Sequence, residues 1–279
     1  MSTPRHVRAA ACQMRIDIDD PPTPEAITEV VGQAAAAGAR LIVLPELATS
    51  GYAFRSPQEA SSRAEAPDGP TARRAQDISA RYDCVVVLGF PEVDGGAVYN
   101  SALIADRGRL LGVYRKTHLW DREKLCFTPG RAGPLVVETS IGWVGVMICY
   151  DAEFPEWVRI AVQRGAEVLA VPVNWPLMPR PTGQDAAEVA KIRAASAYYR
   201  IPMVVADRCG RERGVDWIGG SLITDAEGYA LAGPATPHGL ARPTIVSADI
   251  DIAAGRDKSL TDLAHALGDR RPELYRETP

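Results

Sequence analysis

Three ionisable residues in this chain each follow an apolar run that ends at a turn or a helix start. Glu46 closes the run RLIVLPE, Lys116 closes LLGVYRK, and Cys149 closes WVGVMIC. Such runs predict buried strands, and the carboxyl ends of strands in an α/β sheet line the crevice where ligands bind. A carboxylate, a cation and a thiol in one crevice are the parts of a nucleophilic amide hydrolase. These three residues are the candidate catalytic set.

Cys149 stands where a nucleophile is expected. It ends a predicted strand, and Pro155 suits the first turn of the helix that follows. A strand-to-helix turn exposes the side chain, and a nearby helix N-terminus favours the thiolate. An isolated cysteine is more often a buried, unreactive thiol, but the charged residues at other strand ends favour the catalytic interpretation. We therefore expect a lowered pKa for the Cys149 thiol.

Glu46 and Lys116 have the chemistry to support that thiol. Five apolar residues precede Glu46, so we expect its carboxylate to be partly buried, with a pKa raised toward neutrality as a proton shuttle requires. The charge of Lys116 would depress the thiol pKa and stabilise an oxyanion. The alternative for both residues is a solvated loop position. For Glu123, in WDREKLCFTPG, the local pattern alone favours that alternative.

Composition excludes several classes of partner. Of the 279 residues, 46% are hydrophobic and 24% are charged, as in an ordinary soluble globular protein. A net charge of −4 and a pI near 5.7 argue against a nucleic-acid-binding surface. No run reaches the roughly 18 apolar residues of a membrane span. The first residues also lack the apolar centre of a secretion signal, so we expect a cytoplasmic protein with no membrane partner.

The cysteines and histidines predict neither disulfides nor a metal site. The five cysteines are scattered and contain no C-x-x-C pair, which favours reduced thiols in a cytoplasm. The four histidines, His6, His118, His238 and His265, lack the spacing of zinc ligands. We expect no metal and no cofactor.

Periodicity along the rest of the chain predicts alternating strands and helices. The predicted strands are Val7–Gln13, Arg40–Leu44, Cys84–Gly89, Val98–Ala105, Arg109–Arg115, Pro134–Glu138, Gly142–Cys149, Val168–Val173, Met203–Asp207, Trp217–Thr224, Tyr229–Ala232 and Thr244–Ile250. The predicted helices are Pro24–Ala37, Thr71–Tyr82, Pro155–Arg164 and Gln184–Arg200. Loops are expected from the end of the strand at Leu44 to Pro70 and over Thr117–Gly133. The tail from Asp251 is expected to be helical at first.

An internal similarity predicts two related halves. Residues 101–112, SALIADRGRLLG, resemble residues 221–233, SLITDAEGYALAG. Each is a serine-led apolar strand that turns at an aspartate and returns as a strand, although any two hairpins can look alike. A true repeat predicts two α-β halves whose sheets pack face to face with helices outside. Because no Pro/Gly linker divides the chain, we expect one domain over 1–279 with its core at about 7–250.

Three ordered segments carry a resemblance to a known family. LPELATSGY, YRKTHLWDREKLCFTPG and GVMICYDAEFPE resemble the signature segments of the nitrilase superfamily, the carbon–nitrogen hydrolases. The resemblance implies an α/β fold, a four-layer α-β-β-α sandwich, and no cofactor. It implies that Glu46 is the general base, Lys116 the oxyanion and positioning residue, and Cys149 the nucleophile. Glu123 matches the second glutamate of the family, which helps to hold substrate and lysine.

The resemblance also bears on substrate and assembly. Nitrilases of the family typically have Cys-Trp-Glu at the nucleophile, whereas Cys149-Tyr150-Asp151 looks like the amide-cleaving branches. Relatives that act on carboxylate-bearing substrates often place arginine three or four residues after the cysteine, where this chain has Ala152 and Glu153. A small-molecule amide without a carboxylate near the scissile bond is the expected substrate, cleaved through a thioester on the cysteine to a carboxylate and ammonia or an amine. We also expect a homodimer or larger homo-oligomer, with the C-terminal tail at its interface.

The expected substrate pocket involves four further residues. VPVNWP resembles the strand end beside the acyl pocket of the family, so Asn174 and Trp175 are candidates, and Tyr52 is expected on the other side. The backbone N–H of Tyr150 is expected to help hold the oxyanion. Each aromatic side chain has a core position as its alternative. Other readings are a nitrilase, a carbamoyl-amide hydrolase, an acyl transferase, a Cys-His site with His118 as base, and a catalytically silent interaction protein.

Overall fold

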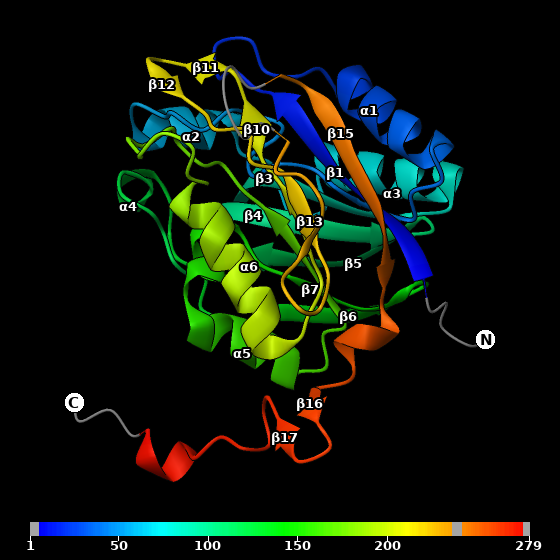
Figure 1. Cartoon of the computed structure of the whole chain (residues 1–279). Helices are drawn as coiled ribbons and strands as arrows, with labels where there is room; N and C mark the ends of the chain where they lie inside the picture. Colours follow the sequence, from blue (N-terminus) through cyan, green and yellow to red (C-terminus); the bar gives the residue numbers. More distant parts are fainter. Residues whose placement is uncertain (1–5, 236–241, 276–279) are drawn as a thin grey trace.

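Two β-sheets stacked face to face form the centre of the molecule (Figure 1). The computed structural model describes residues 6–235 and 242–275. The first, seven-stranded sheet has the order β10-β1-β2-β3-β4-β5, with β15 also paired to β1. Its strands are β1 (His6–Arg15), β2 (Leu41–Val43), β3 (Val85–Asp94), β4 (Ala97–Asp106), β5 (Arg109–Arg115), β10 (Arg208–Cys209) and β15 (Thr244–Asp251).

The second sheet has six strands in the order β14-β13-β9-β8-β7-β6. They are β6 (Leu135–Thr139), β7 (Gly142–Val146), β8 (Val168–Pro172), β9 (Met203–Ala206), β13 (Leu222–Thr224) and β14 (Ala230–Ala232). A separate hairpin, β11 (Arg211–Glu212) and β12 (Val215–Asp216), lies between β10 and β13 in sequence.

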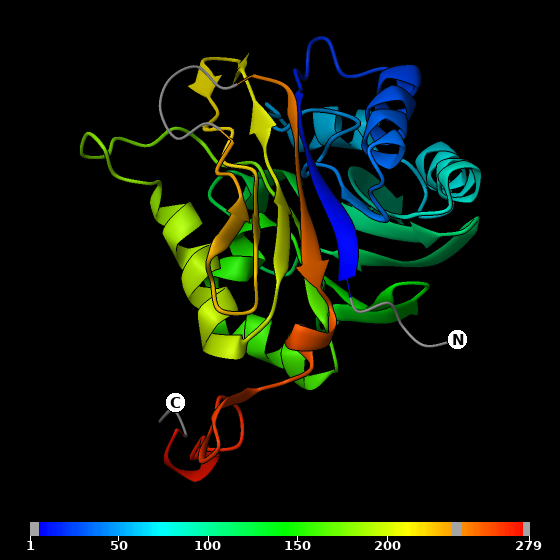
Figure 2. The same cartoon turned by 45° about the vertical axis from the view of Figure 1, so that its right-hand side comes forward.

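Four helices cover the outer faces of the sheets (Figure 2). They are α1 (Pro24–Ala36) and α3 (Pro70–Tyr82) on the first sheet and α5 (Pro155–Gln163) and α6 (Ala187–Tyr199) on the second. Side chains of a strand alternate between its faces, so Ala10 and Cys12 pack toward α1 and α3 while Ala9 and Ala11 face the other sheet. The predicted four-layer α-β-β-α sandwich is confirmed.

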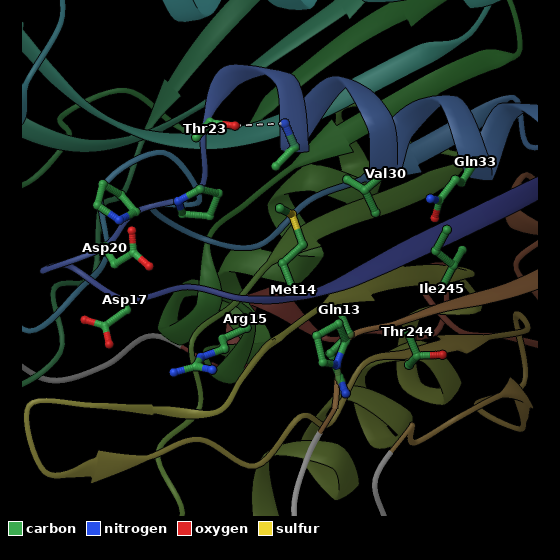
Figure 3. Close-up of a pocket in the computed structure, with 14 residues that line it drawn as sticks. Gln13, Met14, Arg15, Asp17, Asp20, Thr23, Val30, Gln33, Thr244 and Ile245 are labelled. Atoms are coloured by element: carbon green, nitrogen blue, oxygen red, sulfur yellow. Dashed lines mark hydrogen bonds between the residues drawn. The ribbon is translucent and has the colours of Figure 1, made fainter.

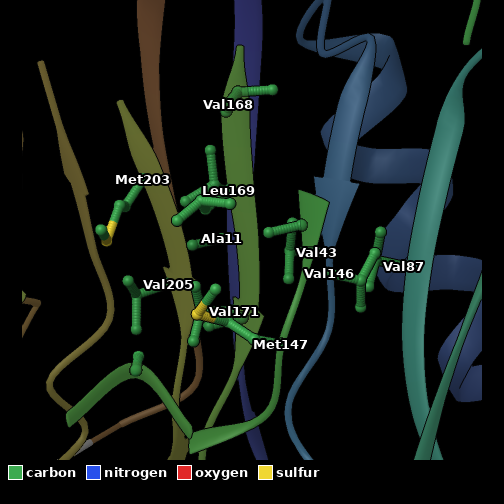
Figure 4. Close-up of a cluster of buried hydrophobic side chains, with 14 of the residues drawn as sticks. Ala11, Val43, Val87, Val146, Met147, Val168, Leu169, Val171, Met203 and Val205 are labelled. Carbon is green, nitrogen blue, oxygen red and sulfur yellow. The ribbon is translucent and has the colours of Figure 1, made fainter. Parts of the chain in front are cut away.

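The inner faces of the two sheets bury the main hydrophobic core (Figure 4). Val43 of β2 and Val87 of β3 meet Val146, Leu169 and Val171 of the second sheet, and all five are fully buried. Such strands must be apolar on both faces because one face meets the other sheet and one meets helices. That requirement explains the continuous apolar runs that end at the candidate catalytic residues.

The two halves of the chain repeat one topology, as the internal similarity predicts. In each half three parallel strands, β1-β2-β3 or β7-β8-β9, continue into an antiparallel hairpin at the sheet edge. The similar segments 101–112 and 221–233 contribute to the equivalent hairpins β4–β5 and β13–β14. Both large sheets lie within residues 6–251, and a single domain over 1–279 stays our interpretation.

Two short helices occupy segments that the sequence analysis treats as loops. In α2 (Pro57–Arg63), the Ser56 side chain accepts a hydrogen bond from Glu59 N–H at 3.2 Å, and proline stands in the first turn. A serine cap followed by proline favours a helix start, and this local signal was overlooked. The second helix is the single turn α4 (Glu123–Cys126), which carries a candidate site residue.

The expected strand Trp217–Thr224 is wrong in its first half. Only Leu222–Thr224 joins the sheet ladder, as β13. Trp217 instead makes an isolated bridge to Pro176, and Gly219 has φ of +61°, which bends the chain away from the ladder. The bend leaves Trp217 near the candidate site.

The tail after β15 is also not the expected helix. One 3-10 turn, Ala253–Gly255, leads into a small hairpin of β16 (Ser259–Thr261) and β17 (Ala264–His265) that projects from the sandwich in Figures 1 and 2. Leu263 on this projection is 95% exposed. An oligomer interface at the tail stays a prediction. Within residues 6–235 and 242–275, no helix is both long and apolar enough to cross a membrane.

Candidate active site

The ends of three strands bring Glu46, Lys116 and Cys149 to one place. Glu46 follows β2 after an extended Leu44-Pro45 step, Lys116 directly follows β5, and Cys149 begins a 3-10 turn, Cys149–Glu153, just after β7. Glu46 and Lys116 both act electrostatically on the Cys149 thiol. Strands of the two stacked sheets thus deliver the predicted catalytic residues to one buried site.

A close backbone approach holds the turn that carries Glu46. Ala48 N–H donates to the carbonyl of Gly89 on β3 at 2.9 Å. A Cβ atom at Gly89 would lie 2.5 Å from the Pro45 carbonyl oxygen and 2.7 Å from Glu46 Cα, so only glycine fits there. The turn therefore rests directly on β3, which fixes the position of the Glu46 carboxylate.

Lys116 bridges two carboxylates. Its Nζ donates to Glu46 Oε1 at 2.7 Å and to Glu123 Oε1 at 2.8 Å, and the lysine is fully buried. Burial lowers the pKa of Lys116, but the charges of Glu123 and Glu46 outweigh burial and raise that pKa well above its ordinary value. The ammonium therefore keeps its charge throughout the physiological pH range. Glu123, a loop residue by its sequence pattern, is 4% exposed and belongs to this cluster.

The Glu46 carboxyl group has the properties of a proton shuttle. Burial, only partly offset by the Lys116 charge, raises the pKa of Glu46 to about 8. That direction is the one expected from the apolar run before it. Among the described residues, no group hydrogen-bonds its buried Oε2 atom. One oxygen is thus held by the protein, and the other is left for an exchanging proton or a substrate group.

Asn100 completes the cluster, and the sequence analysis missed it. From β4, its Nδ2 donates to Glu46 Oε1 at 2.6 Å and to Glu123 Oε1 at 3.2 Å. Its backbone carbonyl accepts from Lys116 N–H at 2.8 Å. The available signal was an amide side chain just before the apolar run SALIA, because a buried amide requires partners.

Cys149 is held in a strained, buried turn. Its φ of +48° lies in the left-handed region, and its thiol donates to the carbonyl oxygen of Asn174 at 3.8 Å. Burial, together with the Glu46 charge, raises the pKa of Cys149 well above its ordinary value, against the lowering effect of Lys116. The expected lowered pKa is therefore wrong, because burial and a nearby carboxylate outweigh the lysine. The thiol is protonated at neutral pH and requires a base.

Asp151 ties the nucleophile turn to the segment after β5. Its buried carboxylate accepts from Tyr114 Oη at 2.7 Å, from Ile148 N–H at 3.2 Å and from His118 N–H at 2.8 Å. The ring Nδ1 of His118 also lies 2.7 Å from Asp151 Oδ1. The described hydrogen bonds join His118 to Asp151 and not to Cys149, so the Cys-His alternative gains no support.

Asn174 acts through its backbone and its amide. Its Nδ2 donates to the Glu46 carbonyl oxygen at 2.9 Å, and its own carbonyl accepts from the Cys149 thiol. Trp175 is only 2% exposed, and its backbone N–H donates to Asp207 Oδ1 at 3.1 Å. Both predicted pocket residues therefore lie beside the site as parts of its framework.

A cavity of about 690 Å³ adjoins this site at Glu123, while Glu46, Lys116 and Cys149 are not in its lining. It is lined by residues 52–55, 120–123, 176–178 and 213–217 together with Phe127. Of the predicted substrate-binding residues, its lining includes Tyr52 but not Tyr150, Asn174 or Trp175. Burial first, and then the charges of Glu123, Glu46 and Cys149, raise the pKa of Tyr52 well above its ordinary value. Tyr52 and Glu123 thus connect the cavity to the catalytic cluster.

A second cavity, of about 670 Å³, lies elsewhere (Figure 3). Figure 3 shows Gln13 and Arg15 of β1, Val30 of α1 and Thr244 of β15 around it. Its lining includes none of the candidate catalytic residues. Size alone therefore does not identify the site, whereas the buried ionisable cluster does.

Within the part of the chain that the structure describes, no group of three or more His, Cys, Asp or Glu side chains could hold a metal ion. His238 lies outside the described residues.

Comparison with known proteins identifies the family of the chain. The family model for carbon-nitrogen hydrolases matches residues 8–257. The chain belongs to the carbon–nitrogen hydrolase family. The match covers all three strand ends that carry the candidate catalytic residues, and the chain shares the mixed α/β architecture of solved nitrilase-superfamily structures.

Individual relatives differ in the activity attributed to them. A nitrilase from Pyrococcus abyssi is 36% identical over 96% of this chain and 99% of its own length. An N-carbamoylputrescine amidase from Arabidopsis thaliana is 30% identical over 98% of this chain and 95% of its own. A solved Glu-to-Gln mutant of the amidase from Nesterenkonia sp. AN1, in which acrylamide has added to the active-site cysteine, superposes with a TM-score of 0.76 at 27% identity, covering 96% of this chain and 98% of that one.

Proposed function

We propose that this chain hydrolyses carboxylic amides to an acid and ammonia through a thioester on Cys149. The proposal rests above all on Lys116, which bridges Glu46 and Glu123 beside a buried, protonated thiol. A thiol of raised pKa needs a base, and Glu46, with its pKa raised to about 8, is suited to that task. The adduct on the active-site cysteine of the Nesterenkonia amidase supports a nucleophilic role for the cysteine.

The first half-reaction forms the thioester. Glu46 takes the thiol proton as Cys149 Sγ bonds to the amide carbon, and the carbonyl π electrons move to its oxygen. Lys116 and the backbone N–H of Tyr150 hold this oxyanion, since an N–H in the first turn of a helix has no intrahelical acceptor. Loss of one such donor costs about 3–4 kcal/mol of transition-state stabilisation. Glu46 then donates its proton to the nitrogen, the C–N bond breaks, and ammonia leaves.

The second half-reaction hydrolyses the thioester. Glu46 takes a proton from water as the water oxygen attacks the thioester carbonyl, and the same donors hold the oxyanion. The C–S bond then breaks, and the Cys149 thiolate regains its proton from Glu46. One group thus serves as base and acid in turn, which suits a carboxyl group whose pKa is near the working pH.

The names of the relatives keep nitriles and carbamoyl compounds as second candidates. We favour amides because the nucleophile segment Cys149-Tyr150-Asp151 departs from the Cys-Trp-Glu of nitrilases. The test is ammonia release by the purified chain from amides, nitriles and N-carbamoyl amines, with intact mass spectrometry of the protein. Amide turnover with an acyl adduct supports the proposal. Absence of turnover and of any adduct in a folded protein would favour a silent interaction protein.

We expect kcat/KM to have an acidic limb well above the ordinary glutamate range, near pH 8. Glu46 must be ionised to accept the thiol proton, and burial raises its pKa to about 8. Activity therefore falls about tenfold per pH unit below that value. A pH–rate profile on one amide measures the limb. A limb near pH 4.5, the ordinary Glu value, would contradict this assignment.

We expect activity to survive prolonged treatment with a chelator. All the groups needed for the two half-reactions are supplied by Glu46, Lys116, Cys149 and a backbone N–H. The measurement compares ammonia release before and after EDTA treatment and gel filtration. A loss of activity that is reversed by adding one particular metal would overturn the metal-free mechanism.

The homo-oligomeric state and cytoplasmic location stay predictions.

A further inference from the structure

The cavity beside the site has a preformed aromatic wall. Trp217 is 4% exposed, and its ring lies edge-on to Tyr52 with centroids 5.3 Å apart. Phe54 and Phe127 form a second edge-on pair at 5.5 Å. Together with Trp120, five aromatic residues line this cavity in a chain that is only 6% aromatic. Such a wall offers apolar ring area, and its polar atoms are the Tyr52 hydroxyl and the indole N–H groups of Trp120 and Trp217.

Buried polar contacts hold the wall in place. The Arg208 guanidinium stacks over the Trp217 ring at 4.4 Å and pairs with Glu212 at 3.0 Å, with both charged side chains fully buried. The Glu212 carboxylate accepts from Tyr52 N–H at 3.1 Å and from Ala53 N–H at 2.9 Å. The aromatic wall is thus organised before substrate enters, so binding costs little side-chain ordering.

The proposed leaving-group side of the site is buried. In the proposed mechanism the leaving nitrogen lies against Glu46, which is fully buried, as is Lys116. The cavity instead reaches the cluster through Glu123 and Tyr52. The cavity is therefore the space assigned to the acyl group of the substrate.

Apart from Glu123, which Lys116 binds, the charged side chains of the cavity lining are either paired or exposed to solvent. Arg213 is engaged by Asp19 at 2.6 Å and by Glu59 at 2.7 Å. Arg55, Asp121, Arg122 and Asp216 are exposed to solvent. The mouth of the cavity also exposes apolar side chains: Leu177 is 51%, Met178 54% and Val215 36% exposed. A charged acyl group would lose hydration along the aromatic wall without gaining a buried partner.

We propose that the preferred substrates are primary amides of bulky apolar carboxylic acids, whose hydrocarbon group packs between Tyr52, Phe54 and Trp217. This proposal rests on the amidase function proposed above. The test compares kcat/KM of the full chain for propionamide, hexanamide and 4-phenylbutanamide, with 6-aminohexanamide and adipic acid monoamide as charged analogues. Hexanamide and 4-phenylbutanamide should exceed propionamide by at least about tenfold, because each buried methylene contributes to binding. Both charged analogues should fall at least about tenfold below hexanamide.

The outcomes separate this proposal from the amidase function. Turnover of propionamide equal to or above that of the longer amides overturns the substrate class and leaves the amidase function standing. A charged analogue that matches hexanamide does the same. Absence of turnover with every amide, in a protein whose circular dichroism shows a folded state, overturns the amidase function.

Variants locate the binding surface. Val215→Asp at the exposed mouth and Trp217→Ala in the wall should each lower the hexanamide-to-propionamide ratio of kcat/KM by about fivefold or more. Leu231→Asp on β14 is the matched control, because Leu231 is 44% exposed and lies outside the cavity lining. An unchanged ratio in both Val215→Asp and Trp217→Ala would overturn the assignment of this wall to the acyl group.

Discussion

Replacing Cys149 by alanine is expected to lower kcat/KM for amides by at least about 10⁴-fold while the fold stays intact. The thiol provides the bond that splits the reaction into acylation and deacylation, and no other described group is placed to replace it. Because the side chain is small and donates only to the Asn174 carbonyl, its loss leaves the packing of the turn largely unchanged. Cys149→Ser should also be inactive, since a hydroxyl is a far weaker nucleophile here than a thiol.

The covalent step can be observed directly. Intact mass spectrometry of the wild-type enzyme, quenched during turnover of a slow amide, should show an added acyl group, and peptide mapping should place it on Cys149. Cys126→Ala is the matched control, because Cys126 lies on α4 near the cavity but outside the catalytic cluster, and it should keep its activity. A turnover-competent Cys149→Ala enzyme, or an adduct on another cysteine, would refute the mechanism.

Much of the site can be predicted from the periodicity of the sequence. Apolar runs identify buried strands, and stacked sheets place the carboxyl ends of β2, β5 and β7 close together. Glu46, Lys116 and Cys149 could therefore be predicted from their runs alone. The four-layer architecture followed from the same runs and from the repeated hairpin. Glu123 needed the family resemblance, since its local sequence is typical of a solvated loop.

The residues that the sequence analysis missed act through contacts distant in sequence. Asn100 and Asp151 lie far along the chain from several of their partners, so no local pattern reveals their roles. The pKa of Cys149 was misjudged for a similar reason. The lowering effect of Lys116 could be anticipated, but the degree of burial and the proximity of Glu46 are properties of the folded molecule.

The substrate wall shows the same limit. Trp217 was expected to lie in a strand, but the bend at Gly219 takes it out of the ladder and leaves it on the cavity wall. Neighbouring Trp175 is one of the four predicted pocket residues; it is 2% exposed, and its backbone N–H donates to Asp207. Both tryptophans are suitable by type, and only the backbone path separates them.

Replacing Lys116 by methionine is expected to lower kcat/KM by about 10³-fold or more and to destabilise the fold by about 3–5 kcal/mol at pH 8. The activity falls because an oxyanion donor is lost. The stability falls because Glu46 and Glu123 remain buried without their shared counter-charge. Methionine keeps an unbranched side chain of similar length, so the effect comes mainly from the missing charge.

The pH dependence of this destabilisation identifies its cause. Without Lys116, the folded-state pKa of Glu46, which burial already raises, rises further above the unfolded-state value. A group with a raised folded-state pKa stabilises the fold at low pH and loses this contribution as pH rises. The charge of Lys116 is constant over the same range, because its pKa is raised above an ordinary value of 10.5. The stability difference between wild type and Lys116→Met should therefore be smaller at pH 5.5 than at pH 8, as measured by urea unfolding.

Lys124→Met, an exposed neighbour on α4, should change stability by less than about 0.5 kcal/mol at both pH values. A deficit as large at pH 5.5 as at pH 8 would mean that lost packing, and not two uncompensated carboxylates, destabilises the variant.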